Sequence, residues 1–196
     1  MTAPRGTQHS LFGTAGAEGN EQEVHTPDLI LDPVREALGG TIAFDPCAAS
    51  TPADWFATHN LTVDPQVKAL EAALRAKPDD KTRVALKRQR KALYLSGPTF
   101  TEEWNVGPTF VNMPFEFLKD WLKLFERNER HCPIVALMPV RTQRTWWMAH
   151  MVGRVGVMLK PFPFKGQVQA FPAPLCLVGY GVDLGRVVVE TGRVRF

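Results

Sequence analysis

The chain has 196 residues, of which 44% are hydrophobic and 22% are charged, and its formal net charge at pH 7 is +3. A chain of this length and apolar content is expected to form one globular domain with a sizeable core. No apolar run is long enough to span a membrane, and the N-terminal segment lacks the hydrophobic stretch of a signal peptide. The three cysteines lack metal-ligand spacing, so we expect reduced thiols in a cytoplasmic protein and no metal site.

The chain is expected to divide into an arm, a domain and a tail. Residues 1–23 are rich in Gly, Thr, Ala and Glu and poor in apolar side chains, which predicts a flexible N-terminal arm. The domain is expected to cover residues 24–185, followed by a C-terminal tail at 186–196.

Within the domain, short apolar runs alternate with segments of helical periodicity. Helices are expected at residues 29–38, 67–74, 84–95, 117–125 and 144–151. Strands are expected at residues 41–44, 61–63, 109–111, 133–139, 155–159 and 175–180. The first strand is expected to open into a loop at Asp45-Pro46, and the third to deliver Asn112 at its end. Alternating strands and helices predict an α/β domain with a mostly parallel sheet.

The segment from residue 66 to residue 95 is strongly basic. Nine Lys or Arg residues and three Asp or Glu residues lie between Gln66 and Tyr94, so this stretch carries about +6 and the remainder about −3. We interpret the segment as a basic helical insertion that contacts a polyanion. Its predicted nucleic-acid-binding residues are Lys87, Arg88, Arg90 and Lys91. The alternative is a solvated helical hairpin whose lysines face water.

Two polar segments follow predicted strands. Asp45-Pro46-Cys47-Ala48 combines a carboxylate with small side chains that let the backbone approach a ligand, and Asn112 follows a second strand. Ligands of parallel sheets bind outside the carboxyl ends of the strands, so we expect both segments to line one site. No Gly-x-Gly-x-x-Gly motif is present, and a dinucleotide cofactor is therefore not expected.

The turn Asn112-Met113-Pro114-Phe115 has the residue types that hold an exocyclic amine. The lone pair of adenine's N6 amine is delocalised into the ring, and acceptor bonds from Asn112 and the Met113 carbonyl would localise it. Pro114 would stiffen the turn, and Phe115 would stack on a flipped base. Catalysis of this kind depends on orientation and electrostatic preorganisation.

A second candidate contact region follows the strand at 133–139. It mixes phosphate-binding and stacking groups, which suits a nucleic acid. Its predicted nucleic-acid-binding residues are Arg141, Thr142, Arg144 and Trp146. The alternative is that Trp146 and Trp147 pack in the core or at its rim.

With these residues in order, the chain resembles the phage-type DNA N6-adenine methyltransferase family. The resemblance runs from about Ser10 to Tyr180. Its elements are Ser10-Leu11-Phe12, Thr26-Pro27-Asp28-Leu29, Phe44-Asp45-Pro46-Cys47-Ala48, Asn112-x-Pro114-Phe115, Leu137-Met138-Pro139-Val140-Arg141-Thr142 with Trp146-Trp147, and Phe171-Pro172-Ala173-Pro174. Met113 stands where the family has a proline, and His25 stands where an aromatic residue commonly precedes Thr-Pro.

The resemblance implies a single Rossmann-like methyltransferase domain with S-adenosylmethionine as cofactor and DNA with a flipped adenine as substrate. The residues it implies for cofactor binding are Thr26, Pro27, Asp45, Pro46, Cys47, Ala48 and Asp64. The turn it implies for catalysis comprises Asn112, Met113, Pro114 and Phe115. It also implies a phage or prophage origin and the cytoplasm of a bacterial host.

Two other interpretations stay open at the level of sequence. The first is a DNA-binding protein on a degenerate, non-catalytic methyltransferase fold, with Met113 as the mark of decay. The second keeps the enzyme but changes the acceptor, because Asn-x-Pro-aromatic turns also hold cytosine N4 amines and glutamine amides. The basic segment favours nucleic acid over protein without choosing the base.

Overall fold

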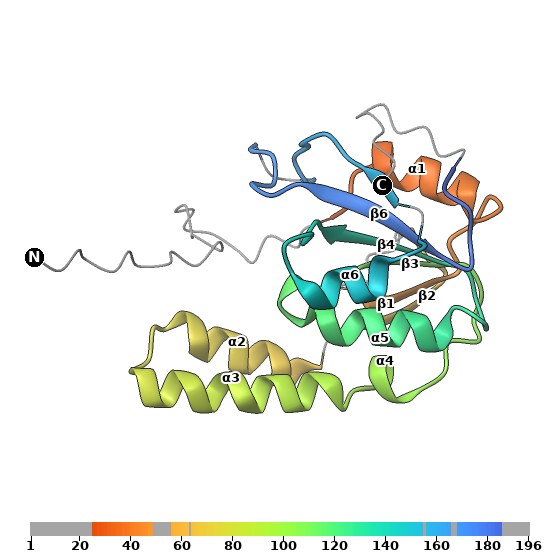
Figure 1. Ribbon diagram of the computed structural model, residues 1–196. Helices are drawn as coiled ribbons and strands as arrows, with labels where there is room; N and C mark the ends of the chain where they lie inside the picture. The colour runs from red at the N-terminus through yellow and green to blue at the C-terminus, as the bar shows by residue number, and fades with distance from the viewer. Residues whose placement is uncertain (1–24, 49–55, 63, 155, 166–167, 186–196) are drawn as a thin grey trace, which may run out of the picture.

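A six-stranded sheet with the order β2-β1-β3-β4-β6-β5 forms the centre of the domain (Figure 1). The computed structural model describes residues 25–48, 56–62, 64–154, 156–165 and 168–185. The strands are β1 (Phe44–Ala48), β2 (His59–Thr62), β3 (Thr109–Asn112), β4 (Ile134–Pro139), β5 (Gly156–Met158) and β6 (Leu175–Tyr180). The expected arm at 1–23, the expected tail at 186–196, and Val63 and Val155 of two expected strands lie outside the described residues.

The sheet is mostly parallel. β1, β2, β3 and β4 pair in parallel, whereas β6 lies antiparallel to both of its neighbours, β4 and β5. This α/β arrangement agrees with the fold class predicted from the sequence and is compatible with a Rossmann-like fold.

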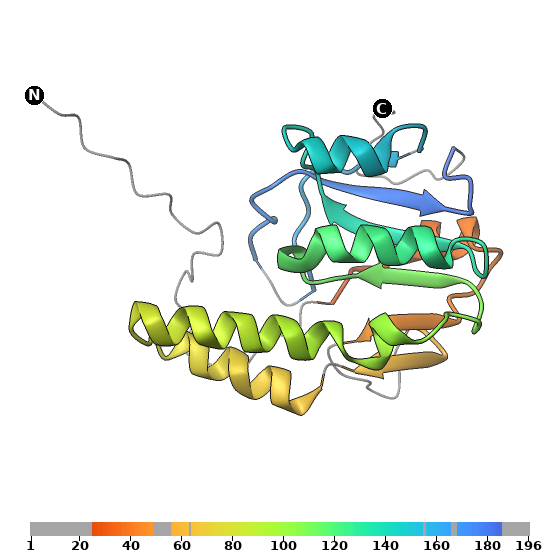
Figure 2. The ribbon, with the colours of Figure 1, turned by 60° about the horizontal axis from the view of Figure 1, so that its bottom comes forward.

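Helices cover both faces of the sheet (Figures 1 and 2). They are α1 (Asp28–Ala37), α2 (Pro65–Arg75), α3 (Asp80–Leu95), α4 (Pro98–Thr101), α5 (Leu118–Asn128) and α6 (Thr145–Met151), with a short 3₁₀ helix η1 (Phe115–Phe117). α1 packs on one face, against a core that includes Val135 and Leu137. α5 packs on the other face with Ala136 and Met138. β4 is therefore buried along its whole length, which explains its continuous apolar sequence.

Local sequence signals explain where several helices begin and end. Asp64 and Asp79 cap α2 and α3, because their Oδ1 atoms accept from the backbone N–H groups of Gln66 (2.6 Å) and Thr82 (3.0 Å). α1 ends where Gly40, at a φ of +102°, donates its N–H to the carbonyl of Arg35 (2.7 Å). Glycine adopts such a φ without the steric penalty that a Cβ atom brings.

The basic segment forms the predicted pair of helices. α2 and α3 run antiparallel as a hairpin that extends past the end of the sheet toward which β3 and β4 point (Figures 1 and 2). Val67 is the buried residue of α2, and α3 buries none of its side chains completely. Most of the hairpin surface is thus in contact with solvent.

One strand extends further than predicted, and one short helix was not predicted. β1 does not open into a loop at Asp45-Pro46 but continues through both residues to Ala48. Its register against β2 shifts between Asp45 and Ala48, and such an irregularity accommodates a proline that cannot donate to a neighbouring strand. α3 ends at Leu95, as predicted, and the short helix α4, which was not predicted, follows it from Pro98, because proline fits the first position of a helix.

Candidate functional site

The strand order places a switch point between β1 and β3. The connection that leaves β1 leads to β2 on one side, whereas the connection that leaves β3 leads to β4 on the other side. Adjacent parallel strands whose connections diverge in this way form the usual ligand site of an open α/β sheet. β3 ends at Asn112 and β1 ends at Ala48, so the two predicted polar segments meet at this point.

Asn112 links three distant parts of the chain. Its side-chain Nδ2 donates to the hydroxyl Oγ1 of Thr26 at 3.3 Å, across 86 residues of sequence. Its backbone carbonyl accepts from the thiol of Cys47, with an Sγ–O distance of 3.7 Å. Thr26 is buried and Asn112 is half-buried. Thr26 and Cys47 therefore both contact Asn112, and all three residues were predicted to line the site.

Thr26 is held in place by the segments around it. The backbone carbonyl of His25 accepts from the N–H of Lys165 at 3.0 Å, and the Lys165 ammonium pairs with Asp28 at 2.9 Å. Pro27, the N-cap of α1, accepts from the backbone N–H of Ile30 at 2.9 Å. The start of α1 is thus anchored on both sides of the hydroxyl that contacts Asn112.

Asp45 and Cys47 form a compact structure within β1. Asp45 is 4% exposed, and its Oδ1 accepts from the backbone N–H of Cys47 at 3.0 Å. Burial and the nearby Asp45 carboxylate raise the pKa of the Cys47 thiol well above its ordinary value, despite a hydrogen bond with Tyr94. The thiol therefore stays protonated and acts as a hydrogen-bond donor to the Asn112 carbonyl rather than as a nucleophile.

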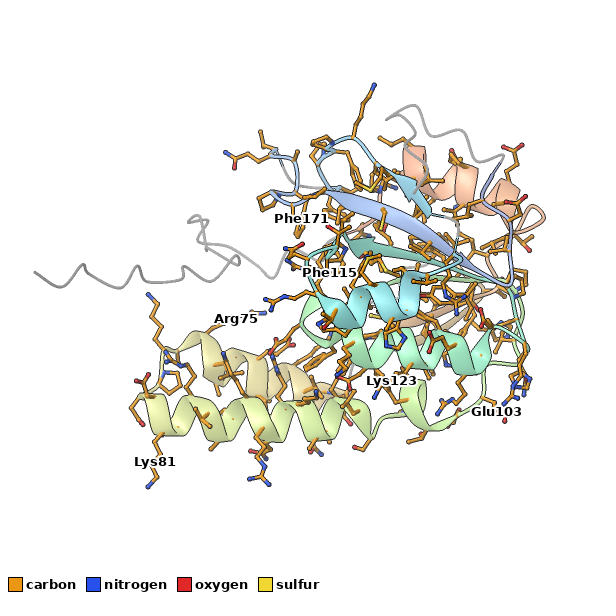
Figure 3. All side chains as sticks on the ribbon, in the orientation of Figure 1. Arg75, Lys81, Glu103, Phe115, Lys123 and Phe171 are labelled. Atoms are coloured by element: carbon orange, nitrogen blue, oxygen red, sulfur yellow. The ribbon has the colours of Figure 1, made fainter. Side chains whose placement is uncertain are left out.

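The remaining residues of the turn point in different directions. The side chain of Met113 is 2% exposed and packs in the core on the α5 face of the sheet. Pro114 is the N-cap of η1, and its carbonyl accepts from the N–H of Phe117 at 3.1 Å. The half-buried ring of Phe115 meets the edge of Phe171 at 5.4 Å and 83° (Figure 3). The turn is therefore fixed at every position.

Phe171 was not expected to contact the turn. It lies in the Phe-Pro-Ala-Pro segment before β6, and it also contacts Phe164. The sequence marks that segment only as part of the family resemblance, and no local pattern links it to Phe115. A contact between residues so far apart in the chain follows from tertiary packing alone.

Asp64 has a structural role at the end of β2. Its Oδ1 caps α2, and no contact among the described residues joins Asp64 to Asn112 or Thr26. Pro46 is buried in β1, where its carbonyl accepts from the hydroxyl of Thr99 at 2.7 Å. Asp64 and Pro46 were predicted to bind a cofactor, but these hydrogen bonds do not join either residue to Asn112.

The loop after β4 lies at the same edge of the sheet as Asn112, because β3 and β4 are parallel. Thr142 and Arg144 are exposed, and Arg141 is half-buried. The N–H of Arg144 donates to the carbonyl of Arg141 at 2.8 Å and closes a turn before α6. Trp146 lies partly buried against the α5-face core, with its ring 6.4 Å from that of the buried Trp147. Packing in the core thus accounts for much of the burial of Trp146 and Trp147.

The four basic residues singled out on α3 divide into two pairs. Lys87 and Arg88 are exposed, and no acidic side chain in the described part of the chain lies within ion-pair distance of either. Arg90 forms ion pairs with Glu71 and Glu116. Lys91 pairs with Asp120 at 2.9 Å. Only the first pair is available to an external anion without loss of a contact.

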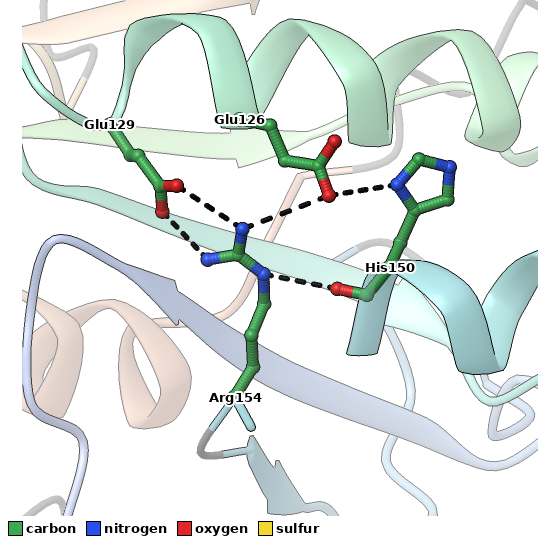
Figure 4. Close-up of polar contacts among 4 residues, drawn as sticks. All are labelled: Glu126, Glu129, His150 and Arg154. Atoms are coloured by element: carbon green, nitrogen blue, oxygen red, sulfur yellow. Dashed lines mark hydrogen bonds and ion pairs between the residues drawn. The ribbon is translucent and has the colours of Figure 1, made fainter. Parts of the chain in front are cut away.

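A second charged cluster lies at the opposite edge of the sheet and joins α5 to α6 (Figure 4). Arg154 contacts both carboxylate oxygens of Glu129, at 2.6 and 3.2 Å, and its guanidinium lies 4.1 Å from the ring centre of Tyr180. His150 Nδ1 lies 2.8 Å from the Glu126 carboxylate. Tyr180 pairs with Ile134 at the amino end of β4, so this cluster is remote from Asn112.

Within the described ranges, no group of three His, Cys, Asp or Glu side chains could hold a metal ion. No helix in that part of the chain is both long and apolar enough to cross a membrane. Comparison with protein-family models, with curated proteins and with solved structures finds no match for this chain.

Proposed function

We propose that the protein is an S-adenosylmethionine-dependent DNA methyltransferase that modifies the N6 amine of a flipped adenine. The proposal rests on the hydrogen bonding of the Asn112 amide. Its Nδ2 is occupied by Thr26, whereas its Oδ1 receives no hydrogen bond from the described residues. The amide therefore presents a pre-oriented acceptor at the switch point of the sheet.

Such an acceptor suits the chemistry of an adenine amine. Oδ1 of Asn112 and the backbone carbonyl of Met113 would accept the two N6 hydrogens and localise the nitrogen lone pair. The N6 nitrogen would then be the nucleophile that accepts the transferred group, and one of its two hydrogens would leave as a proton to solvent. Because the turn is already ordered, little reorganisation is required during the reaction.

The position of Met113 supports this role for the turn. Met113 carries its side chain into the core, on the face opposite to Asn112, so the residue can contribute only its backbone toward the site. The proline of the family motif would offer the same carbonyl. Phe115, held by Phe171 and only half-buried, keeps ring surface on which a base can stack.

The cofactor supplies an electrophilic methyl group when bound. Thr26, Pro27 and the Asp45–Ala48 stretch would hold it, because they lie at the carboxyl end of β1 beside Asn112. The short side chains of Cys47 and Ala48 allow a ligand to approach the strand end, and the buried Asp45 carboxylate keeps the strand end in place. The Thr26 hydroxyl and the Asp45 carboxylate are hydrogen-bonding groups of the kind that would engage the polar groups of a nucleoside.

Methyl transfer tests the proposal directly. Purified protein should transfer labelled methyl from S-adenosylmethionine to unmodified duplex DNA, and the label should remain in adenine after digestion to nucleosides. Asn112→Ala should abolish transfer, whereas Asn105→Ala, at an exposed asparagine before β3, should retain it.

Three results would count against the proposal in different ways. Label found in cytosine would keep the enzyme and change the acceptor. A wild-type protein that is stabilised by S-adenosylmethionine but inert on varied adenine-containing DNAs would overturn the reaction. Binding of DNA without any thermal stabilisation by the cofactor would favour the degenerate, non-catalytic protein.

A further inference from the structure

Helix α3 contacts residues next to the Asn112–Phe115 turn on two sides. Arg90 and Tyr94 are one helical turn apart on α3. Arg90 contacts Glu116, the residue that follows the turn, and Tyr94 contacts Cys47, which donates to the carbonyl of Asn112. One end of the hairpin therefore packs beside the site.

Arg90 is the centre of the first contact. Its side chain is only 12% exposed, and it joins three elements: α3, which carries it, α2 through Glu71 at 3.6 Å, and η1 through Glu116. Its guanidinium also lies 5.4 Å from the ring centre of Phe117. The planar, forked guanidinium serves several partners at once, which an ammonium on the same backbone could not.

Tyr94 forms the second contact. Its ring stacks on Phe117 at 4.7 Å with an interplanar angle of 24°, and its hydroxyl lies 3.9 Å from the Cys47 sulfur. Burial raises the pKa of Tyr94 well above its ordinary value, so the hydroxyl stays protonated. The C-terminal end of α3 thus packs directly against the segment that contains the turn.

Toward its N-terminal end, α3 presents an exposed basic surface. Two shallow grooves, of about 530 and 510 Å³, share Arg88 and Ala92 and so form one continuous strip along the helix. The strip begins at Lys81 and ends at Glu116 and Phe117. Lys81, Lys87 and Arg88 are exposed on it, and in the described structure none of them is paired with an acid.

We propose that the α2–α3 hairpin is a duplex-DNA-binding arm, and that Arg90 is a positioning residue that couples the arm to the catalytic turn. The inference rests on the proposed function and adds its DNA-contact element. Duplex DNA is the partner because a segment of about +6 faces solvent beside a domain of about −3, and phosphates are the complementary charge. Phosphates engaged by Lys87 and Arg88 would bring the duplex along a strip that ends at Glu116 and Phe117, directly after the turn.

The first experiment measures binding of the protein to an unmodified DNA duplex without cofactor. Lys87→Glu/Arg88→Glu should weaken the affinity by about 10- to 100-fold and lower the salt dependence of log Kd by about 2. The matched control, Lys123→Glu/Arg130→Glu, changes the same charge at exposed positions on and just after α5 and should stay within about 3-fold of wild type. Equal losses of affinity in both double variants would overturn the proposal that the hairpin binds duplex DNA. A preference for a structured RNA over duplex DNA would also overturn it.

The second experiment tests whether Arg90 couples the hairpin to the turn. Arg90→Met should leave the Kd for DNA within about 3-fold of wild type, lower kcat by 10-fold or more, and accelerate hydrogen exchange of the amides at 112–117. Arg90→Lys should restore part of both readouts, and combining Arg90→Met with Glu116→Gln should cost no more than Arg90→Met alone. Wild-type exchange in Arg90→Met would overturn the coupling.

The two experiments distinguish failure of this inference from failure of the proposed function. If wild-type protein transfers no methyl group, DNA binding and hydrogen exchange still report on the hairpin and on Arg90. If transfer occurs but the Lys87 and Arg88 variant binds and methylates like wild type, the inference alone fails.

Discussion

Asn112, the last residue of β3, donates its side-chain N–H to the hydroxyl of Thr26, which lies 86 residues earlier in the chain. In this arrangement Nδ2 faces Thr26 and Oδ1 faces away from it. With Nδ2 engaged, Oδ1 is the atom left to accept from a substrate amine. The proposed catalytic group is thus held by a residue two positions before the first helix.

Thr26→Val should reduce methyl transfer without unfolding the protein. Valine keeps the shape of threonine but removes the acceptor for Asn112, so the amide loses its anchor. We expect kcat/KM to fall by about 10-fold, since small losses of orientation are costly in such sites. Thr26→Ser should keep most activity, and Thr101→Val, whose hydroxyl bonds to the carbonyl of Gly97, should match wild type. Equal kcat/KM in Thr26→Val and wild type would contradict this role.

Met113 should matter for stability and not for chemistry. Its side chain is buried in the α5-face core, so Met113→Ala should lower the free energy of unfolding by about 2–5 kcal/mol. Met113→Leu conserves the volume and should cost less than about 1.5 kcal/mol. Urea unfolding measures both values. Activity per folded molecule should be retained in Met113→Leu, and a selective loss of kcat there would show that the side chain acts in the site.

Stability should fall at alkaline pH, in part through Cys176. Burial in β6 raises the pKa of its thiol from 9.0 to about 12. Unfolding restores the lower value, so the contribution is fully present below pH 9 and is lost as the pH rises toward 12. Thermal unfolding between pH 7 and pH 11 should show a shallower decline of Tm in Cys176→Ala than in wild type. Identical profiles would show that this thiol does not contribute.

The Arg154 cluster should stabilise the fold without affecting the reaction. Arg154 makes a two-pronged contact with Glu129 and lies over Tyr180, and its side chain is 19% exposed. Arg154→Met should therefore lower the free energy of unfolding by about 1–3 kcal/mol. Arg130→Met, at an exposed site nearby, should change it by less than about 0.5 kcal/mol. Because the cluster lies at the edge of the sheet away from Asn112, kcat of the folded fraction should be unchanged, and a selective loss of kcat would contradict this separation.

Much of the fold could be predicted because burial leaves a local pattern. β4 is covered on both faces and reads as a continuous apolar run, whereas α5 is covered on one face and shows the helical period. The cap at Asp79 and the glycine stop after α1 are also local signals. The extent of β1 was wrong because a proline reads as a strand end, whereas strand pairing accommodated it with a shift in register.

The sequence by itself determined the α/β class, the two helices of the basic segment, and the delivery of Asn112 at the end of a strand. Only the tertiary structure decided that β6 runs antiparallel, that Thr26 orients Asn112, and that Phe171 supports Phe115. The same holds for the cations of α3. Arg88 and Arg90 are two residues apart and chemically identical, yet one is exposed and the other is held by two carboxylates. Which face of α3 meets the domain depends on packing between segments distant in sequence, and the local sequence of α3, unlike that of α5, does not show it.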